Sequence, residues 1–298
     1  MKIYIKDHPS HAGKWIYRGY FSAWSFLKYE PVFYNSLDIV EEQSYMIMST
    51  DSSVSLEDLD TISKSEKSFI FVQPNCFPDP WGKHPNFYSC CNDEIIDSLN
   101  EMTNVTLWTF LDAKDEYYKK WDNVYTIPLA YDSLNYSKNI ENKYNFDVCF
   151  IGGIANNGFN EKYKIMYDHF DVLRNSNLQC GIFINKNLSH QEENDIICTS
   201  RVTLNIHDAY QRELGLDTNE RTFKSLGLNG CLVSDKVNQI SRIFPHIQMS
   251  SDPSEMLNIV QHYISMRSDQ LQEIKDNNRQ LISKDHTYIE RVREILKK

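Results

Sequence analysis

Short apolar runs recur along the chain, and the stretches between them are long enough to hold a helix. Compact runs such as residues 45–48 and 69–72 are typical of strands that are buried on both faces of a parallel sheet. Their alternation with amphipathic segments predicts an α/β protein with doubly wound sheets. The expected strands are residues 2–6, 32–34, 45–48, 69–72, 105–111 and 124–129, followed by 147–151, 180–184, 202–206 and 231–234.

A polar segment without periodicity, residues 131–145, interrupts this series, and we interpret it as a link between two domains. The sequence therefore predicts a Rossmann-like N-terminal domain at residues 1–131 and a Rossmann-like C-terminal domain at residues 146–275. Residues 276–298 are expected to form a C-terminal helix that packs back on the first domain. The other expected helices are residues 15–29, part of 52–67, 93–102, one between 112 and 124, 160–174, 190–198, 219–228 and a helix that begins at Asp252-Pro253.

The composition is that of a globular protein and argues against several classes of function. Of 298 residues, 41% are hydrophobic, and the net charge of −10 disfavours broad binding to nucleic acid or to an anionic membrane surface. Seven cysteines without a C-x-x-C pair suggest reduced thiols and argue against a zinc site. The N-terminus has the pattern of a strand and not of a secretory signal, and no apolar run approaches the length of a membrane span. We therefore expect a cytoplasmic protein.

Residues 217–235 have the pattern of a polar loop, a short helix, a glycine stop and an apolar strand. Thr218 or Asn219 can cap the helix, and Asn229-Gly230 can end it. The start of a helix favours an anion, and Arg221 in its first turn could hold a diphosphate at two points. An ordinary α/β crossover with a surface arginine would have the same pattern.

Residues 221–231, R-T-F-K-S-L-G-L-N-G-C, resemble the R-x-F-E-x-x-x-x-G segment of glycosyltransferases of the spore-maturation (CgeB-like) type, within the glycosyl transferases group 1. Residues 124–132, 147–153 and 286–291 resemble three further segments of these enzymes in the same order, so the resemblance covers residues 105–298. It implies a GT-B fold, in which two doubly wound Rossmann-like domains face a central cleft. The N-terminal domain would bind the acceptor and the C-terminal domain the nucleotide sugar.

The resemblance also implies transfer of a sugar from a nucleotide diphosphate such as UDP to an acceptor hydroxyl, without a metal or other cofactor. The sequence agrees, because no Asp-x-Asp pair follows an expected strand. The chain departs from the pattern at Lys224, where the family usually has Glu. Because related retaining enzymes use that acid near the donor sugar or ribose, the details of donor binding and the stereochemical outcome stay open.

The candidate donor-binding residues follow expected strands of the second domain or begin the helix at residue 219. Arg221 is the first choice for the diphosphate, and Lys224, one turn later, could pair with phosphate or be a solvated lysine. Glycines after a strand let the backbone approach a ligand. His207 or Asp208 could contact the sugar or base, although Asp208 could simply stabilise a turn. The full set is Arg221, Lys224, Asn219, Thr218, Gly152, Gly153, His207 and Asp208.

In the first domain, His8 and His11 flank the loop after the first strand, where several inverting GT-B enzymes place a histidine base. His11 and Asp112 are the candidate catalytic residues, and either loop histidine could instead be structural. Arg18, Asp79 and Trp81 are the candidate acceptor-binding residues; Arg18 could instead pair with an acid, and the Trp81 ring could stack on a sugar or a base.

Three functions fit these observations. The first is a glycosyltransferase that acts on a glycan or a small acceptor. The second keeps the chemistry but takes a modified DNA base as acceptor, as some phage sugar transferases do, and it predicts a basic rim despite the acidic total. The third is a nucleotide-binding module that kept the fold and lost activity, which the Lys224 departure would explain.

Overall fold

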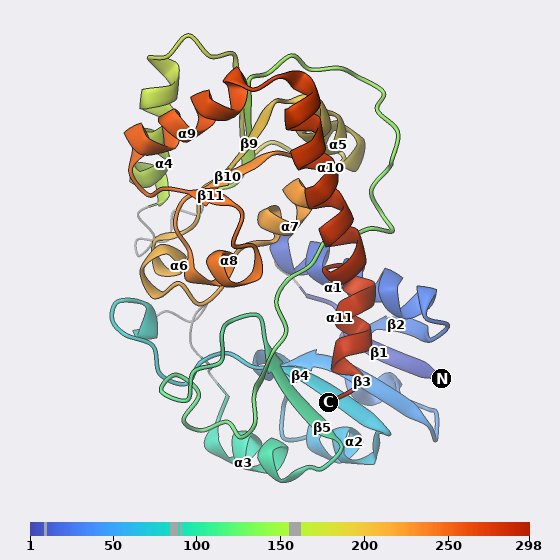
Figure 1. Cartoon of the computed structure of the whole chain (residues 1–298). Helices are drawn as coiled ribbons and strands as arrows, with labels where there is room; N and C mark the ends of the chain where they lie inside the picture. The colour runs from blue at the N-terminus through green and yellow to red at the C-terminus, as the bar shows by residue number, and fades with distance from the viewer. Residues whose placement is uncertain (9–10, 84–88, 90, 155–161) are drawn as a thin grey trace. The chain divides into compact units, whose positions relative to one another are not determined.

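The computed structural model describes residues 1–8, 11–83, 89, 91–154 and 162–298. Contacts within the chain divide it into two compact units. The first unit contains Met1–Pro128 and Tyr288–Lys298, and the second contains Leu129–Thr287. Each unit is an α/β structure of its own (Figure 1).

The first unit is built on a parallel sheet in the order β2-β1-β3-β4-β5-β6. Parallel pairing places Tyr4 beside both Val32 and Ile47, so β1 connects to β2 through a helix on one face of the sheet. The strands are β1 Lys2–Lys6, β2 Glu30–Tyr34, β3 Tyr45–Thr50, β4 Lys67–Phe71, β5 Val105–Thr109 and β6 Tyr125–Thr126. The helices are α1 His11–Phe26, α2 Asp58–Lys64, α3 Asp93–Glu101 and α11 Tyr288–Ile295, with short 3-10 turns at Leu37–Ile39, Asp51–Ser53 and Trp81–Lys83.

Successive apolar side chains of the strands point to opposite faces of the first sheet, and helices cover each face. Ile47 and Ile70 share a core with Ile62 of α2 and Leu99 of α3. On the other face, α1 packs beside α11, the last helix of the chain, and the Tyr288 ring lies 4.9 Å from that of Tyr20 (Figure 1). The C-terminal segment therefore completes the layer of helices over one face of the first sheet.

The second unit is also built on a parallel sheet, in the order β11-β10-β9-β7-β8. Alternate strand residues, such as Phe150 and Leu204, share a core with Phe170 of α4, Val260 of α9 and Leu271 of α10. The strands are β7 Val148–Gly152, β8 Cys180–Ile184, β9 Val202–Asn205, β10 Leu232–Ser234 and β11 Gln248–Met249. The helices are α4 Lys162–Arg174, α5 His190–Thr199, α6 Ala209–Leu214, α7 Glu220–Gly227, α8 Asn238–Ile243, α9 Pro253–Ser265 and α10 Ser268–Asp285.

Two doubly wound parallel sheets confirm the predicted fold class. The helix expected between residues 112 and 124 is wrong, because this segment forms turns. Its groups bind the loop after β4 instead: Trp121 Nε1 donates to the Gln73 carbonyl at 3.0 Å, and Asn75 N donates to the Tyr117 carbonyl at 2.8 Å. Residues 276–298 are two helices and not one, since α10 ends at Asp285 and α11 begins at Tyr288.

Within the described residues, no helix is both long and apolar enough to cross a membrane. The described cysteines, which are all but Cys90, are free thiols.

Candidate functional site

The candidate site of the second unit lies where β7 and β9 end and α7 begins. After β9 the chain passes through residues 206–208, forms the short helix α6 and turns at Gly215, whose φ of 67° is left-handed. Asn219 then occupies the N-cap position of α7. This path brings the first turn of α7 against the carboxyl ends of the strands, the edge at which parallel sheets bind ligands.

The Arg221 guanidinium is fixed by three neighbours. Its NH1 donates to Asn205 Oδ1 at 2.8 Å, and its Cζ lies 4.9 Å from the centre of the Phe150 ring. Gly152 lies directly against the guanidinium, and a Cβ there would come within 2.3 Å of NH2. Burial lowers the pKa of Arg221, while Glu220 and Asp208 oppose that shift; an arginine stays charged in either case. The Arg221 side chain is therefore packed and oriented and is not a solvated surface arginine, and its contact with a diphosphate stays a prediction.

Lys162, the first residue of α4, is a second cation near Arg221 that the sequence prediction missed. Its side chain is 8% exposed, and Nζ lies 2.9 Å from Asp208 Oδ1. Burial lowers the pKa of Lys162, and the positive charge of Arg221 lowers it further, while Asp208 raises it. Two cations that repel each other are stabilised when an anion binds between them. A lysine is unfavourable at the positive end of a helix dipole, so the position of Lys162 at the start of an expected helix was the sequence signal that could have indicated a functional role.

Lys224 is held inside the second unit by two carboxylates. Its Nζ lies 2.9 Å from Glu193 Oε1 and 3.7 Å from Glu220 Oε2, and the Tyr136 hydroxyl donates to Glu193 Oε2 at 2.7 Å. Burial acts to lower the pKa of Lys224, but Glu220 and Glu193 together outweigh it and raise the pKa. The side chain is 12% exposed, so the solvated lysine is the wrong alternative. The ammonium is already paired within the chain.

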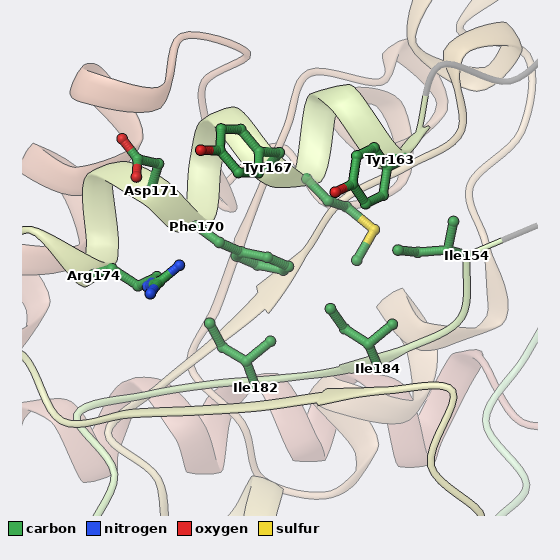
Figure 2. Close-up of a pocket in the computed structure, with 9 residues that line it drawn as sticks. Ile154, Tyr163, Tyr167, Phe170, Asp171, Arg174, Ile182 and Ile184 are labelled. Carbon is green, nitrogen blue, oxygen red and sulfur yellow. The ribbon is translucent and has the colours of Figure 1, made fainter.

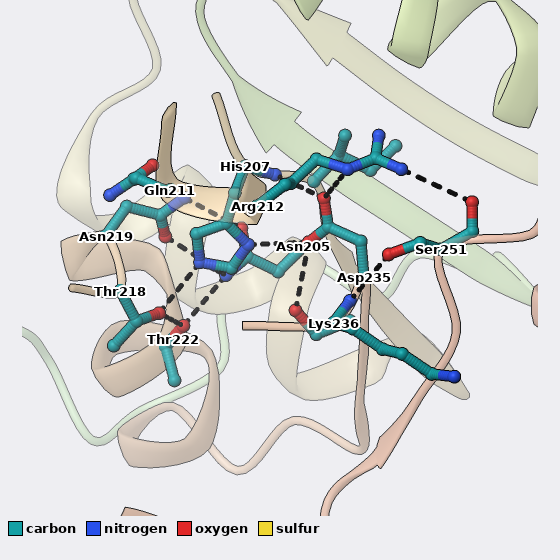
Figure 3. A network of polar contacts seen from close by, with 12 residues as sticks. Asn205, His207, Gln211, Arg212, Thr218, Asn219, Thr222, Asp235, Lys236 and Ser251 are labelled. Carbon is teal, nitrogen blue, oxygen red and sulfur yellow. Dashed lines mark hydrogen bonds and ion pairs between the residues drawn. The ribbon is translucent and has the colours of Figure 1, made fainter. Parts of the chain in front are cut away.

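His207 lies at the centre of a buried polar network (Figure 3). Its side chain is 0% exposed, with Nδ1 2.6 Å from Asp235 Oδ1 and Nε2 2.8 Å from Thr218 Oγ1. Asn219 exchanges two amide hydrogen bonds with Asn205, at 3.0 and 3.1 Å. Both ring nitrogens of His207 are thus bonded to the protein, and its ring does not face a ligand.

The remaining donor candidates lie around this network. Asp208 pairs with Lys162 and forms a capping box with Gln211 at the start of α6. Gly153 is exposed directly after β7, and a Cβ there would lie 3.2 Å from Asn185 Oδ1. The structure therefore gathers most of the predicted donor residues, together with Asn205, Asp235 and Lys162, at the carboxyl edge of one sheet.

The candidate catalytic and acceptor residues all belong to the first unit. Asp112 is half-buried after β5, Arg18 is exposed on α1, and Asp79 is exposed in the loop after β4. Trp81 is 5% exposed, so its ring packs inside the unit and is not offered for stacking. His11 is the first residue of α1, and its side chain lies outside the part of the chain that the structure describes.

His8 is the described histidine of the first loop. Its ring stacks on Tyr17, with centroids 5.7 Å apart, and burial lowers the pKa of His8 against an opposing effect of Asp7. Gly13 makes this position possible, since a Cβ would lie 2.1 Å from His8 Nδ1. This histidine is consequently held in place and favours its neutral form.

A separate pocket of about 240 Å³ lies between α4 and β8 (Figure 2). Its walls are mainly aliphatic and aromatic, and they contain none of the candidate donor residues. The lining residues are Ile154, Tyr163, Met166, Tyr167, Phe170, Asp171, Arg174, Ile182 and Ile184. Such walls suit apolar groups and not a diphosphate. No group of three or more His, Cys, Asp or Glu side chains among the described residues could hold a metal ion.

Comparison with solved structures defines the fold of this chain, which matches that of GT-B proteins. The N-terminal domain of the trehalose-6-phosphate phosphatase of Candida albicans aligns with a TM-score of 0.61 and 7% identity over 99% of this chain and 96% of that one. T4 phage BGT, solved with its substrate UDP-glucose, aligns with a TM-score of 0.54 and 10% identity over 100% and 98%. The UDP-forming α,α-trehalose-phosphate synthase of Burkholderia vietnamiensis aligns with a TM-score of 0.57 and 10% identity over 98% and 79%.

The chain belongs to the glycosyl transferase-like family, whose model matches residues 139–297. No curated protein matches the sequence. The predicted GT-B glycosyltransferase of the group 1 type is thereby confirmed, and the narrower resemblance to the spore-maturation type stays a prediction.

Proposed function

We propose that this glycosyltransferase binds a nucleotide-diphosphate sugar in its second unit and transfers the sugar to an acceptor hydroxyl without a metal ion. The observation that carries the proposal is a pair of interacting cations, the half-buried Arg221 beside the backbone of Gly152 and the buried Lys162. T4 phage BGT was solved with UDP-glucose, and an α-glucosyltransferase of similar fold was solved with UDP, which supports a uridine diphosphate donor.

The chemistry requires stabilisation of a leaving group. When the bond between the anomeric carbon and the diphosphate oxygen breaks, negative charge grows on the diphosphate. Arg221 is fixed by Asn205 and Phe150 before any ligand binds, so it needs little reorganisation to stabilise that charge. Lys162 supplies a second positive charge. Together these two groups would neutralise the charge that a divalent cation neutralises in metal-dependent enzymes.

The acceptor hydroxyl must lose a proton as it attacks the anomeric carbon. We assign this step to the first unit, with Asp112 or His11 as the base and Arg18 and Asp79 as acceptor contacts. The position of Asp112 at the carboxyl end of β5 supports the assignment, because ligands of parallel sheets bind at that edge. Turnover assays with different acceptors would identify the acceptor as a glycan, a small molecule or a modified DNA base.

Calorimetric titration with UDP, GDP and ADP tests the donor proposal. We expect one of these nucleotides to bind, and Arg221→Ala to weaken that binding by more than about 1 kcal/mol, as loss of a charge-assisted hydrogen bond should. Arg174→Ala is the matched control, because Arg174 lies on the same unit but lines the apolar pocket. Equal affinities of Arg221→Ala and the wild type would show that Arg221 is structural.

Turnover separates an enzyme from a binding module. We expect the wild-type protein to hydrolyse the matching nucleotide sugar slowly, and faster release of nucleotide with a true acceptor. Glycans and hydroxymethylated DNA are the acceptor classes to compare, and binding to DNA that falls steeply with salt would favour the second. Binding of the nucleotide without turnover of any donor would contradict the transferase proposal and favour the inactive module.

A further inference from the structure

The network under α7 contains two buried residues, His207 and Asp235, that touch no expected position of the donor. We infer that they are positioning residues, which fix the Asn205 amide so that its oxygen faces Arg221. This inference rests on the proposed function, because it concerns the arginine assigned to the diphosphate. It adds a role for two side chains that would otherwise be buried polar groups of the core (Figure 3).

The partners of His207 decide which role each ring nitrogen has. An ionised Asp235 only accepts hydrogen bonds, so the Nδ1 that lies 2.6 Å from its Oδ1 must carry the proton. Burial acts to raise the pKa of Asp235, but the interactions with His207 and Arg212 outweigh it and hold the pKa below its usual range. Nε2 lies 2.8 Å from Thr218 Oγ1 and 3.3 Å from Asn205 Nδ2, and it acts as an acceptor toward that amide nitrogen, which can only donate.

That acceptor helps to orient the Asn205 amide, which is also held by the two amide hydrogen bonds with Asn219. Its Nδ2 donates to Thr222 Oγ1 at 2.8 Å and approaches His207 Nε2 on the same side. Its oxygen must then point the other way, where Arg221 NH1 donates to it at 2.8 Å. The reversed amide would place an NH₂ group against the guanidinium, and two donors would face each other.

Asp235→Asn reverses the polarity of this chain of hydrogen bonds. The backbone N–H of His207 donates to Asp235 Oδ2 at 2.9 Å, and Arg212 Nε lies 3.6 Å from the same oxygen. These donors would hold the oxygen of the new amide on their side, so that its NH₂ faces His207 Nδ1. The ring proton would move to Nε2, which would then oppose the NH₂ group of Asn205.

The sign of the resulting change in affinity distinguishes this mechanism from simple electrostatics. Charged and titratable groups around Asp235 include Arg212, Lys162, His169 and Arg221. Removal of a negative charge beside Arg212, Lys162 and Arg221 would by itself strengthen the binding of an anion. We expect instead that Asp235→Asn weakens UDP binding by about tenfold, since the guanidinium loses its oriented acceptor.

A double-mutant cycle completes the test. UDP affinity is measured by calorimetry for the wild type, Asp235→Asn, Arg221→Ala and the double variant, below the unfolding temperature of each. We expect Asp235→Asn to cause no further loss of UDP affinity once Arg221 is absent. Asp195→Asn is the matched control, because Asp195 is equally buried in the same unit but binds the backbone of residues 141–142.

Each outcome decides one question. Unchanged or tighter UDP binding by Asp235→Asn would overturn the inference, as would an equal loss in the Arg221→Ala background. An equal loss in Asp195→Asn would also overturn it, because the effect would then be general destabilisation. Absence of nucleotide binding in the wild type would instead contradict the proposed function, and the two failures are therefore distinguishable.

Discussion

Gly152 lies at the end of β7, directly against the guanidinium of Arg221. A Cβ at this position would come within 2.3 Å of Arg221 NH2, 2.7 Å of its Cζ and 2.8 Å of Phe150 Cζ. Gly152→Ala should therefore displace the guanidinium, because a real Cβ does not approach other heavy atoms so closely. Gly153→Ala is a control one residue away, where a Cβ would meet only Asn185 Oδ1 at 3.2 Å.

The magnitude follows from what the displaced arginine loses. A hydrogen bond to a charged group contributes about 1.5–3 kcal/mol, and overpacking a buried site costs about 1–3 kcal/mol. Because the guanidinium is the end of a long side chain and can move aside, we expect a decrease in the free energy of unfolding of about 2–4 kcal/mol and not the sum of the maxima. UDP binding should weaken about tenfold or more, since the bond from Arg221 to Asn205 also orients the guanidinium.

Urea unfolding and calorimetric titration with UDP measure these two effects. The double variant Gly152→Ala, Arg221→Ala should be more stable than Gly152→Ala alone, because removal of the guanidinium relieves most of the overlap. The reasoning fails if Gly152→Ala binds UDP as Gly153→Ala does, or if the additional Arg221→Ala change restores no stability.

Two further predictions concern the buried lysines. Lys224→Met should lower the free energy of unfolding, measured in urea, by about 3–5 kcal/mol because it leaves Glu193 buried without its partner. The additional change Glu193→Gln should recover part of that loss. If the losses of the two single variants simply add in the double variant, the pairing is contradicted. For Lys162, the pKa in the folded protein is lowered, so its charge disappears at a lower pH than that of an exposed lysine. UDP affinity of the wild type should therefore fall as the pH rises through this lowered pKa. Lys162→Met should bind UDP more weakly at neutral pH, and its affinity should not fall in that alkaline range. If the variant and the wild type have the same pH profile of UDP affinity, Lys162 is excluded from the site.

The strands and the start of α7 could be predicted because their signals are local. A strand buried on both faces must be largely apolar, and such runs at β3, β4 and β7 are visible in the sequence itself. The same holds for the first turn of α7, where Asn219 and Arg221 stand at fixed offsets from the N-cap. These patterns were sufficient to nominate Arg221.

The error between residues 112 and 124 has a different cause. This segment contains Tyr117, Tyr118 and Trp121, which could line one side of a helix, but its backbone and indole groups bind the loop after β4 about 45 residues earlier in the chain. Tertiary hydrogen bonds thus overrode a local pattern. The short helices α6 and α8 were missed because six residues are too few to show a helical period.

The sequence by itself determined the α/β class, the order of the strands along the chain and the place of the arginine, because each depends on neighbouring residues. Only the tertiary structure decided what the charged side chains do. Lys224 pairs with Glu193 across 31 positions, His207 with Asp235 across 28, and Lys162 with Asp208 between different elements of one unit. No local period encodes such partners, since a hydrogen bond needs two groups within about 3 Å, and the packing of the sheet is what brings them there.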